Sequence, residues 1–200
     1  GGSISGNNQL GWNYNGDGGG VYISSGSFNL HDGTITGNNG YWGGGVNLYS
    51  GAFNMEGGKI SNNTAGRNGT GGGVYVYNGT FTMTGGEISG NRVNSTNDDL
   101  GFDGGGGVYV DLYATLDLSG TARIAGNYAC AVDYKESATF GGGDGGGVYV
   151  AGTFNMRGGE ICDNFAGLAN YKNKYGNDDR RGGDGGGVYL YSKSDFSMSG

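Results

Sequence analysis

Proline is absent from this sequence of 200 residues, which contains one histidine and two cysteines. Collagen needs abundant proline and a strict glycine period of three, so a collagen triple helix is excluded despite the high glycine content. The histidine and cysteines show no zinc-binding spacing, and no phosphate-binding loop or nucleophile elbow occurs. Because no apolar run approaches the ~18 residues of a membrane-spanning helix, we expect no membrane insertion of this segment.

Basic residues are also scarce. The chain has 11 Lys and Arg against 18 Asp and Glu, which gives a net charge of −7 at pH 7. Binding to phosphates requires clustered basic residues, and the only adjacent pair is Arg180 and Arg181. We therefore expect no nucleic acid among the partners of this protein.

Glycine fills 51 positions, and aligning the chain on its glycine clusters gives six copies of one unit. Each unit reads roughly GGGVYV, then GTFTM, then GGEISGN, followed by an insertion of variable length. Apolar and polar residues alternate within each segment, which is typical of short strands with one buried face. The apolar positions include Val21, Val46, Val74, Val108, Val148 and Val188 in the first segment, Phe28, Phe53, Phe81, Leu116, Phe154 and Phe196 in the second, and Ile4, Ile35, Ile60, Ile88, Ile124 and Ile161 in the third.

One unit is too small to enclose a core, so neighbouring units must stack, with equivalent strands paired in parallel about 4.8 Å apart. The predicted fold is all-β: a right-handed parallel β-helix, or β-solenoid, with three short strands per coil and about six coils. Residues 1–200 are expected to form one segment, uncapped at both ends. The variable insertions are placed at 8–17, 39–42, 64–70, 92–104, 128–144 and 165–184.

Turn residues repeat as regularly as the apolar ones. The glycine triplets, such as Gly18, Gly19 and Gly20, are expected at sharp turns because glycine adopts positive φ without a steric penalty. An asparagine follows each isoleucine by three residues, and asparagine also tolerates the left-handed region. We predict that these amides form a hydrogen-bonded structural ladder along the stack. The ladder residues are Asn7, Asn38, Asn63, Asn91, Asn127 and Asn164.

Charges of alternating sign precede four successive isoleucines, at Lys59, Glu87, Arg123 and Glu160. On stacked strands these side chains would face outward beside one another and pair. We therefore interpret Glu87 and Glu160 as structural and not catalytic. The single histidine, His31, is expected to be solvated on the outer surface.

The stretch GGGVYVYNGTFTMTGGEISGN, Gly71–Asn91, and its counterparts cover the chain except for the insertions. In these motifs the chain resembles the glycine-rich right-handed parallel β-helix repeats of bacterial surface proteins. These include adhesins and autotransporter passengers related to chlamydial polymorphic membrane proteins. The resemblance implies a secreted or surface-attached protein that mediates attachment or builds an extension.

The chain starts at the third segment of a unit and stops at the second, and joining Gly200 to Gly1 restores a complete unit. Two interpretations stay open: the residues belong to a longer solenoid, or copies stack end to end. The expected partners are therefore copies of this chain or further coils of a longer one.

The insertions all follow the same turn, and loops gathered on one edge of a stack are where such proteins usually bind ligands. They carry aromatic residues able to stack on glycans or to anchor a host surface protein. These candidate partner-binding residues are Trp12, Tyr14, Tyr41, Trp42, Tyr128, Tyr134, Phe140, Tyr171 and Tyr175. The alternative is that these rings pack the loops onto the stack.

A column of tyrosines forms a second candidate surface, at Tyr75, Tyr109, Tyr149 and Tyr189. These rings lie between inward valines, so they are expected to face outward on four successive coils. Either they form a binding platform, or they stack on one another and stiffen the sheet.

Asp144 and Asp184 occupy equivalent positions in adjacent coils, four residues before the valine. Two neighbouring carboxylates and nearby carbonyl groups form a weak candidate Ca²⁺ site, and solvated turn residues are the favoured explanation of the pattern. No other cofactor is expected.

Cys130 and Cys162 are the only cysteines, and they belong to neighbouring coils. A disulfide between them would suit an extracellular setting, while free thiols are the alternative.

The sequence therefore predicts a non-enzymatic extracellular structural or adhesive solenoid, part of a stalk or filament on the cell surface. The alternative is a carbohydrate-binding or polysaccharide-degrading β-helix protein. Degradation would require two placed carboxylates or a metal site with a basic residue, and no catalytic residue is assigned.

Overall fold

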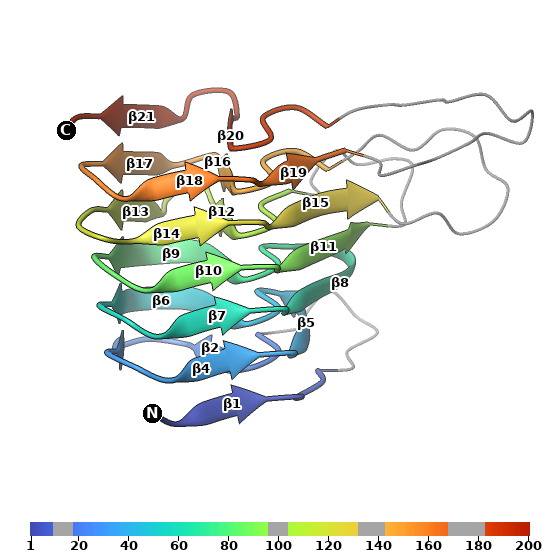
Figure 1. Ribbon diagram of the computed structural model, residues 1–200. Helices are drawn as coiled ribbons and strands as arrows, with labels where there is room; N and C mark the ends of the chain where they lie inside the picture. The colour runs from blue at the N-terminus through green and yellow to red at the C-terminus, as the bar shows by residue number, and fades with distance from the viewer. Residues whose placement is uncertain (10–17, 96–103, 132–142, 168–182) are drawn as a thin grey trace, which may run out of the picture.

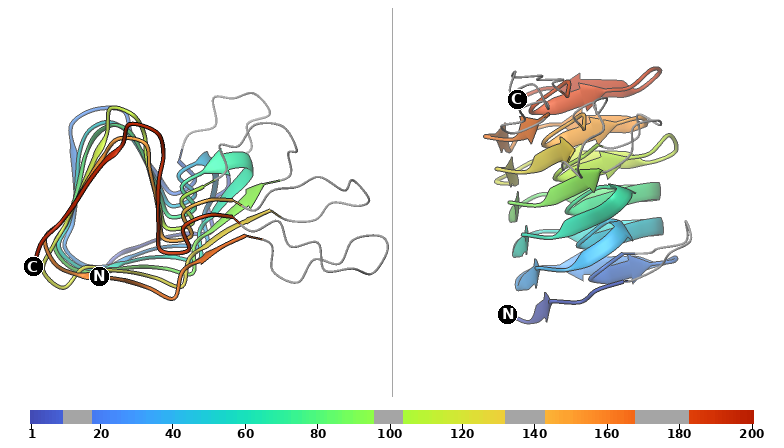
Figure 2. Two further views of the ribbon diagram at one scale, coloured as in Figure 1. Left: turned by 90° about the horizontal axis from the view of Figure 1, so that it is seen from above. Right: turned by 90° about the vertical axis from the view of Figure 1, so that its right-hand side faces the viewer.

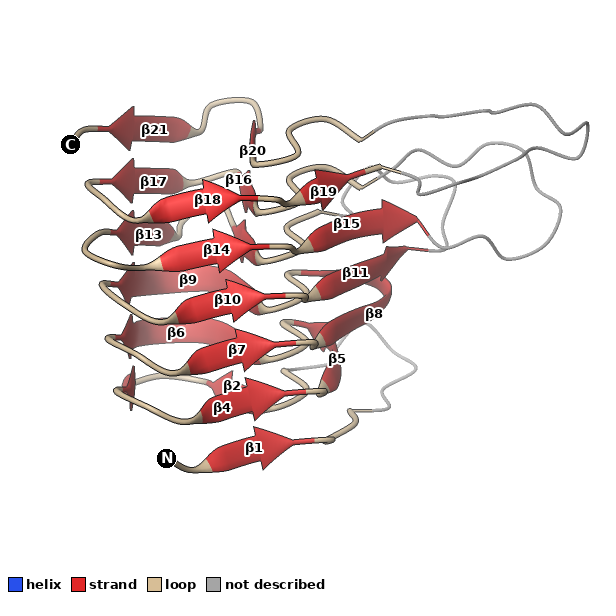
Figure 3. Ribbon diagram, viewed as in Figure 1, coloured by secondary structure: helices blue, strands red, loops and turns tan. Residues whose placement is uncertain are grey.

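The computed structural model describes residues 1–9, 18–95, 104–131, 143–167 and 183–200 (Figure 1). These residues form strands joined by turns and include no helix (Figure 3). All the strands belong to three parallel sheets, and the chain is therefore all-β, as predicted. Within this described part, no helix is present that is long and apolar enough to cross a membrane.

The first sheet contains the isoleucine segment of each repeat. Its strands pair in the order β1 (Ser3–Ser5), β4 (Thr34–Thr36), β7 (Lys59–Ser61), β10 (Glu87–Ser89), β14 (Arg123–Ala125) and β18 (Glu160–Cys162). Each isoleucine lies opposite the isoleucine of the neighbouring repeat, from Ile4 to Ile161. The register therefore follows the alignment of the sequence units.

The second and largest sheet contains the valine and phenylalanine segments. Its strands are β2 (Val21–Ile23), β3 (Ser27–Leu30), β6 (Val46–Met55), β9 (Val74–Met83), β12 (Val108–Val110), β13 (Thr115–Leu118), β16 (Val148–Val150), β17 (Thr153–Met156), β20 (Val188–Leu190) and β21 (Asp195–Met198). In β6 and β9 the two segments form one continuous strand of 10 residues. Elsewhere a turn separates them.

A third sheet was not predicted. It contains β5 (Asn39–Trp42), β8 (Thr64–Thr70), β11 (Arg92–Ser95), β15 (Tyr128–Ala131) and β19 (Phe165–Ala166). These residues begin the predicted insertions, and two of the insertions, 39–42 and 64–70, are strand throughout. Repeats that continue into this sheet therefore have four strand positions and not three.

The third sheet forms because pairing continues through the asparagine turn. The backbone N–H of Thr64 donates to the Asn38 carbonyl, and that of Arg92 donates to the Asn63 carbonyl, both at 2.9 Å. Small or branched residues then face inward, and Ala65, Val93 and Ala129 are completely buried. The segment from the asparagine to the next glycine triplet thus begins as a strand.

The repeats lie above one another and superpose when seen along the stack (Figure 2). They enclose a continuous apolar core, to which one repeat contributes Val46, Leu48, Phe53, Met55 and Ile60, all fully buried. Equivalent phenylalanines stack face to face through the core. The ring centroids are 5.2 Å apart for Phe28 and Phe53 and 4.6 Å apart for Phe53 and Phe81.

An asparagine ladder runs the length of this core. The side-chain Nδ2 group of each asparagine donates to the Oδ1 atom of the next, with distances of 2.9 Å from Asn7 to Asn38 and 3.0 Å from Asn38 to Asn63. The bonds from Asn63 to Asn91, Asn91 to Asn127 and Asn127 to Asn164 are 2.9, 3.0 and 2.9 Å long.

Each amide in the middle of the ladder makes at least four hydrogen bonds. Asn91 Oδ1 accepts from both the backbone N–H and the Nδ2 group of Asn63, at 3.0 and 2.9 Å. Asn91 Nδ2 donates forward to Asn127 Oδ1 and back to the carbonyl oxygen of Ile60. Because Asn91 is completely buried, these bonds satisfy an amide that water cannot reach.

The backbone conformation of the turns differs from the prediction at two positions. Positive φ falls on the residue before each ladder asparagine, for example Gly90 at 64° and Asn62 at 54°, and not on the asparagine itself. In the glycine triplets that begin at Gly43, Gly71, Gly105, Gly145 and Gly185, only the first residue has positive φ, as in Gly71 at 65°. The second is glycine because a Cβ atom on Gly72 would lie 2.5 Å from the Gly106 carbonyl oxygen.

Asn91→Ala should lower the free energy of unfolding by about 3 kcal/mol, because it leaves buried N–H and carbonyl groups of neighbouring repeats without partners. Asn91→Asp should destabilise the protein more at pH 7 than at pH 4. Burial raises the pKa of the introduced carboxyl above its unfolded value, so stability is lost as the pH rises. Chemical denaturation followed by circular dichroism measures both variants.

Asn29→Ala is the matched control, because Asn29 is exposed and accepts a single hydrogen bond, from Asn54 at 2.8 Å. It should change the unfolding free energy by less than about 0.5 kcal/mol. An equally small loss for Asn91→Ala would contradict a stabilising role for the ladder.

Candidate functional site

The predicted aromatic binding residues divide into two groups. Trp12, Tyr14, Tyr134, Phe140, Tyr171 and Tyr175 lie outside the described residues. The others lie on the third sheet, with Tyr41 and Trp42 on β5 and Tyr128 on β15. These three are therefore strand residues, and the structure does not place them in a loop.

Trp42 packs against the outer side of the second sheet. Its ring is nearly parallel to that of Tyr75, with centroids 5.9 Å apart, and Tyr41 meets it edge to face at 5.2 Å. Tyr128 remains more exposed, with Phe165 6.3 Å away and the Arg92 guanidinium over its ring. Trp42 therefore packs onto the stack, which was the alternative to partner binding, whereas the ring of Tyr128 keeps an accessible face.

The tyrosine column is covered and does not form a binding platform. Tyr75, Tyr109 and Tyr149 have relative exposures of 6%, 7% and 1%. Their rings stack, with centroid distances of 5.4 Å and 4.6 Å, and Tyr189 continues the stack 4.9 Å beyond Tyr149. Together with Trp42 of the third sheet, they form a second, aromatic core that lies outside the first.

Asn47 interrupts the tyrosine column in the second repeat, where it lies opposite Tyr22 and Tyr75. It is 1% exposed, and its Oδ1 atom has no hydrogen-bond partner among the described residues. Trp42 stacks on Tyr75, the ring that follows Asn47 in the column. The third sheet therefore adds a ring to the aromatic core next to the repeat that lacks one.

Burial changes the acid–base properties of these tyrosines. The Tyr75 hydroxyl donates to Asp111 Oδ2 at 2.6 Å. Desolvation raises the pKa of Tyr75, Tyr109 and Tyr149 well above the ordinary value, and the negative charge of Asp111 raises it further for the first two. The phenols therefore stay protonated in the folded protein.

The stability of the protein should fall steeply above about pH 10, where the same tyrosines ionise in the unfolded chain. The folded chain then binds more protons than the unfolded one, so the unfolding free energy decreases with pH. Three such groups give a slope approaching about 4 kcal/mol per pH unit. Urea unfolding between pH 8 and pH 11 measures it.

Tyr109→Phe keeps the stacked ring and removes one titrating group. The slope should decrease by about one third in this variant. A slope that Tyr109→Phe leaves unchanged would show that these phenols do not control alkaline unfolding.

The aspartate pair stabilises a turn. Asp144 Oδ1 accepts a hydrogen bond from the backbone N–H of Asp184 at 2.8 Å. Partial burial raises the pKa of Asp144, with the neighbouring carboxylate adding to the effect. Within the described ranges, no group of three or more His, Cys, Asp and Glu residues is placed to hold a metal ion.

Cys162 carries a free thiol, so the predicted disulfide with Cys130 is not formed. Cys162 lies on β18 of the first sheet opposite Ala125, whereas Cys130 lies five residues beyond Ala125, on β15 of the third sheet. The chain turns at Asn127 between the two sheets, as predicted, but the third sheet was not part of the prediction. The thiol instead contacts the Arg123 guanidinium, with Nη2 to Sγ at 3.0 Å.

Iodoacetamide should label Cys162 in the native protein without a reductant, and faster at pH 9 than at pH 7, because partial desolvation raises the pKa of this thiol. Peptide mass spectrometry identifies the modified residue. Cys130→Ser should leave the labelling of Cys162 unchanged. Labelling that requires prior reduction, or that increases in Cys130→Ser, would instead support the disulfide.

The alternating charges pair as the sequence suggested. Lys59 Nζ is 3.4 Å from Glu87, and Arg123 Nε is 3.0 Å from Glu160. A hydrogen bond with Ser89, together with the Lys59 and Arg123 charges, lowers the pKa of Glu87. Glu87 and Glu160 are members of an ion-pair row, which agrees with a structural role.

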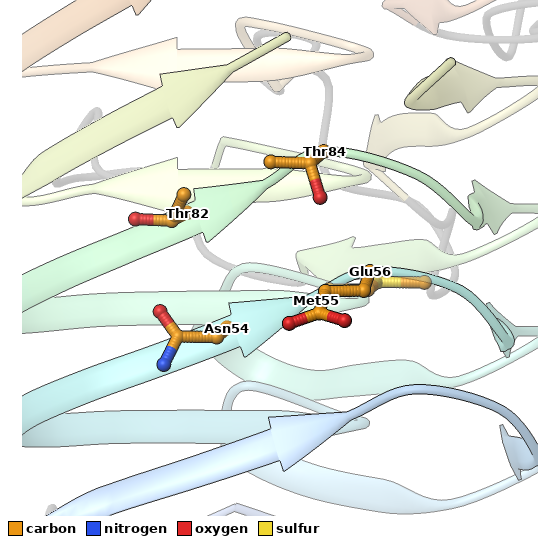
Figure 4. Close-up of a pocket in the computed structure, with 5 residues that line it drawn as sticks. All are labelled: Asn54, Met55, Glu56, Thr82 and Thr84. Atoms are coloured by element: carbon orange, nitrogen blue, oxygen red, sulfur yellow. The ribbon is translucent and has the colours of Figure 1, made fainter. Parts of the chain in front are cut away.

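A hollow of about 250 Å³ opens on the outer face of the second sheet, and sequence reasoning did not identify it. Asn54, Met55 and Glu56 line it from β6 and the turn that follows, while Thr82 and Thr84 line it from β9 and its turn (Figure 4). His31 lies next to it, with Nδ1 2.9 Å from Glu56 Oε2. The outward side chains of two neighbouring repeats thus form one concave polar surface.

No protein family, curated protein or solved structure matches this chain.

Proposed function

We propose that this chain is a segment of a right-handed parallel β-helix and serves as a non-enzymatic structural and adhesive module of an extracellular stalk or filament. The unbroken asparagine ladder is the observation that carries the proposal. A stack in which every repeat makes the same contacts becomes longer without changing its cross-section. That property suits a rigid support.

The placement of the charged groups favours a non-enzymatic role. Glu87 and Glu160 pair with Lys59 and Arg123 on the first sheet. On the second sheet, Asp117 Oδ1 accepts hydrogen bonds from Asn155 at 2.9 Å and from Arg157 at 3.3 Å. We infer that these carboxylates hold neighbouring repeats together and perform no chemistry.

The partners that we propose are further coils of a longer chain or other copies of this chain. Both would use the contacts that join two repeats inside the stack: parallel backbone pairing, stacked apolar side chains and the amide ladder. Host surface proteins and glycans are the proposed adhesive ligands.

Glycan binding is also the second candidate function, and the hollow at Asn54, Glu56, Thr82 and Thr84 favours it. Amide, carboxylate and hydroxyl groups are the side chains that exchange hydrogen bonds with sugars. The hollow contains a single carboxylate, whereas glycoside hydrolysis usually uses two. Binding without cleavage is therefore the form of this candidate that we propose.

An antibody raised against the chain tests the extracellular assignment. It should stain intact cells that produce the protein, and immunogold electron microscopy should place the label along extended surface structures. A cytosolic protein, detected only after permeabilisation, is the control. Staining that appears only in permeabilised cells would contradict the proposal.

A further inference from the structure

The hollow on the second sheet exists because two columns of outward side chains become short at the same repeat. In the first column Thr82 is paired with Asn54 on one side and Asp117 on the other. In the second column Thr84 follows Glu56, and their backbones are aligned by the hydrogen bond from Thr84 N–H to the Met55 carbonyl at 2.9 Å. Threonine is shorter than Asn54, Asp117 and Glu56, and the next residue in the second column, Ser119, is short as well, so a depression forms beside Thr82 and Thr84.

The polar column is also interrupted at this point. Asn54 Nδ2 donates to Asn29 Oδ1 at 2.8 Å, and Asn155 Nδ2 donates to Asp117 Oδ1 at 2.9 Å. Over the described part of the chain, Thr82 makes no side-chain hydrogen bond to either neighbour. The hollow therefore separates two hydrogen-bonded pairs whose side chains are held in place.

The unused hydrogen-bonding capacity of the hollow is balanced between donors and acceptors. Asn54 retains its Oδ1 atom and one N–H, while the Thr82 and Thr84 hydroxyls can each donate and accept. Glu56 uses Oε2 with His31 and keeps its other oxygen as an acceptor. Adjacent donor and acceptor groups match neighbouring hydroxyls of a sugar ring, since each of those hydroxyls also donates and accepts.

The charge and size of the hollow narrow the ligand class. Glu56 places a negative charge at the rim, and the nearby Arg157 guanidinium is already paired with Asp117 at 3.3 Å. Acidic sugars and phosphates should therefore be disfavoured. A volume of about 250 Å³ is below the ~300 Å³ at which pockets for drug-sized ligands begin, which suits one ring.

We propose that this hollow binds one neutral hexose unit of a glycan, through Asn54, Glu56, Thr82 and Thr84. The site lies on the strand surface of the stack, in the rigid part of the fold. It is distinct from the aromatic insertion residues that the sequence suggested for partner binding. The proposal of hexose binding at this site rests on the glycan-binding candidate given above and does not depend on the extracellular assignment.

Nuclear magnetic resonance titration with the methyl glycosides of glucose, galactose and mannose tests the site, and glucuronic acid serves as the acidic probe. At least one neutral glycoside should shift the backbone signals of Asn54, Thr82 and Thr84 with a millimolar dissociation constant, about −4 kcal/mol. Glucuronic acid should bind at least about tenfold more weakly, because Glu56 repels it. No shift at these residues with any neutral glycoside would overturn the proposal.

Thr82→Asn should fill the hollow and weaken binding at least about tenfold, because its amide occupies the ligand volume and can bond to Asn54 and Asp117. Thr153→Asn is the matched control: Thr153 also faces outward on the second sheet, two repeats beyond Thr80 in a neighbouring column. It should leave the affinity unchanged. Equal loss in both variants would contradict a site at Thr82.

Glu56→Gln separates charge from shape. It should reduce the ratio of neutral glycoside affinity to glucuronic acid affinity, because the repelling charge is removed while the shape of the rim is kept. If Glu56→Gln left the affinity difference between neutral glycosides and glucuronic acid unchanged, the ligand would not approach this carboxylate. That result would overturn the assignment of Glu56 to the binding site.

Discussion

Register between repeats is the constraint on which this structure depends, and the buried amide at each asparagine turn enforces it. A one-residue slip would exchange inward and outward side chains on every strand. It would also separate each Oδ1 atom from the two N–H groups that it accepts from, inside a core where no water replaces them. The ladder therefore opposes a slip more strongly than the apolar contacts alone, because apolar contacts are not directional.

Both cores of the protein follow from that register. The inner core stacks equivalent valines, phenylalanines and isoleucines. The continued pairing beyond the asparagine turn adds the third sheet, and Trp42 on this sheet packs against the tyrosines outside the second sheet. The aromatic core therefore depends on the third sheet, whose strands begin directly after the asparagine turns.

The sequence predicted the inner core well, because two independent patterns identify the same inward residues. These patterns are the alternation of apolar and polar residues within each strand and the recurrence of the apolar positions in six units. It predicted the ladder residues for the same reason, since Asn63 and Asn91 recur at one place in each unit. The third sheet was missed because its residues vary: Gly40, Ala65, Val93 and Ala129 share only small or moderate size and an inward position. A column that varies in this way resembles loop sequence.

The missed third sheet affected the predictions about the tyrosine column and the cysteines, whereas the hollow was missed for a separate reason. Tyr109 and Tyr149 alternate with buried valines, and this pattern correctly assigns them to the outer face, but it contains no information about what covers that face. Cys130 and Cys162 belong to adjacent repeats, yet Cys130 lies on the third sheet, which was not predicted, and Cys162 lies on the first. The hollow at Thr82 depends on a difference between neighbouring repeats, whereas an alignment of repeats emphasises what they share.

The asparagine ladder also gives the stack a direction. From Asn7 to Asn127 each Nδ2 group donates to the asparagine of the following repeat, and from Asn38 to Asn164 each Oδ1 atom accepts from the preceding one. The amide dipoles therefore add along the axis, whereas the backbone dipoles of a sheet largely cancel. A repeat approached from one side offers a carbonyl oxygen and from the other an N–H, so two such stacks are complementary only head to tail. Head-to-head contact would bring together like ends of the ladder.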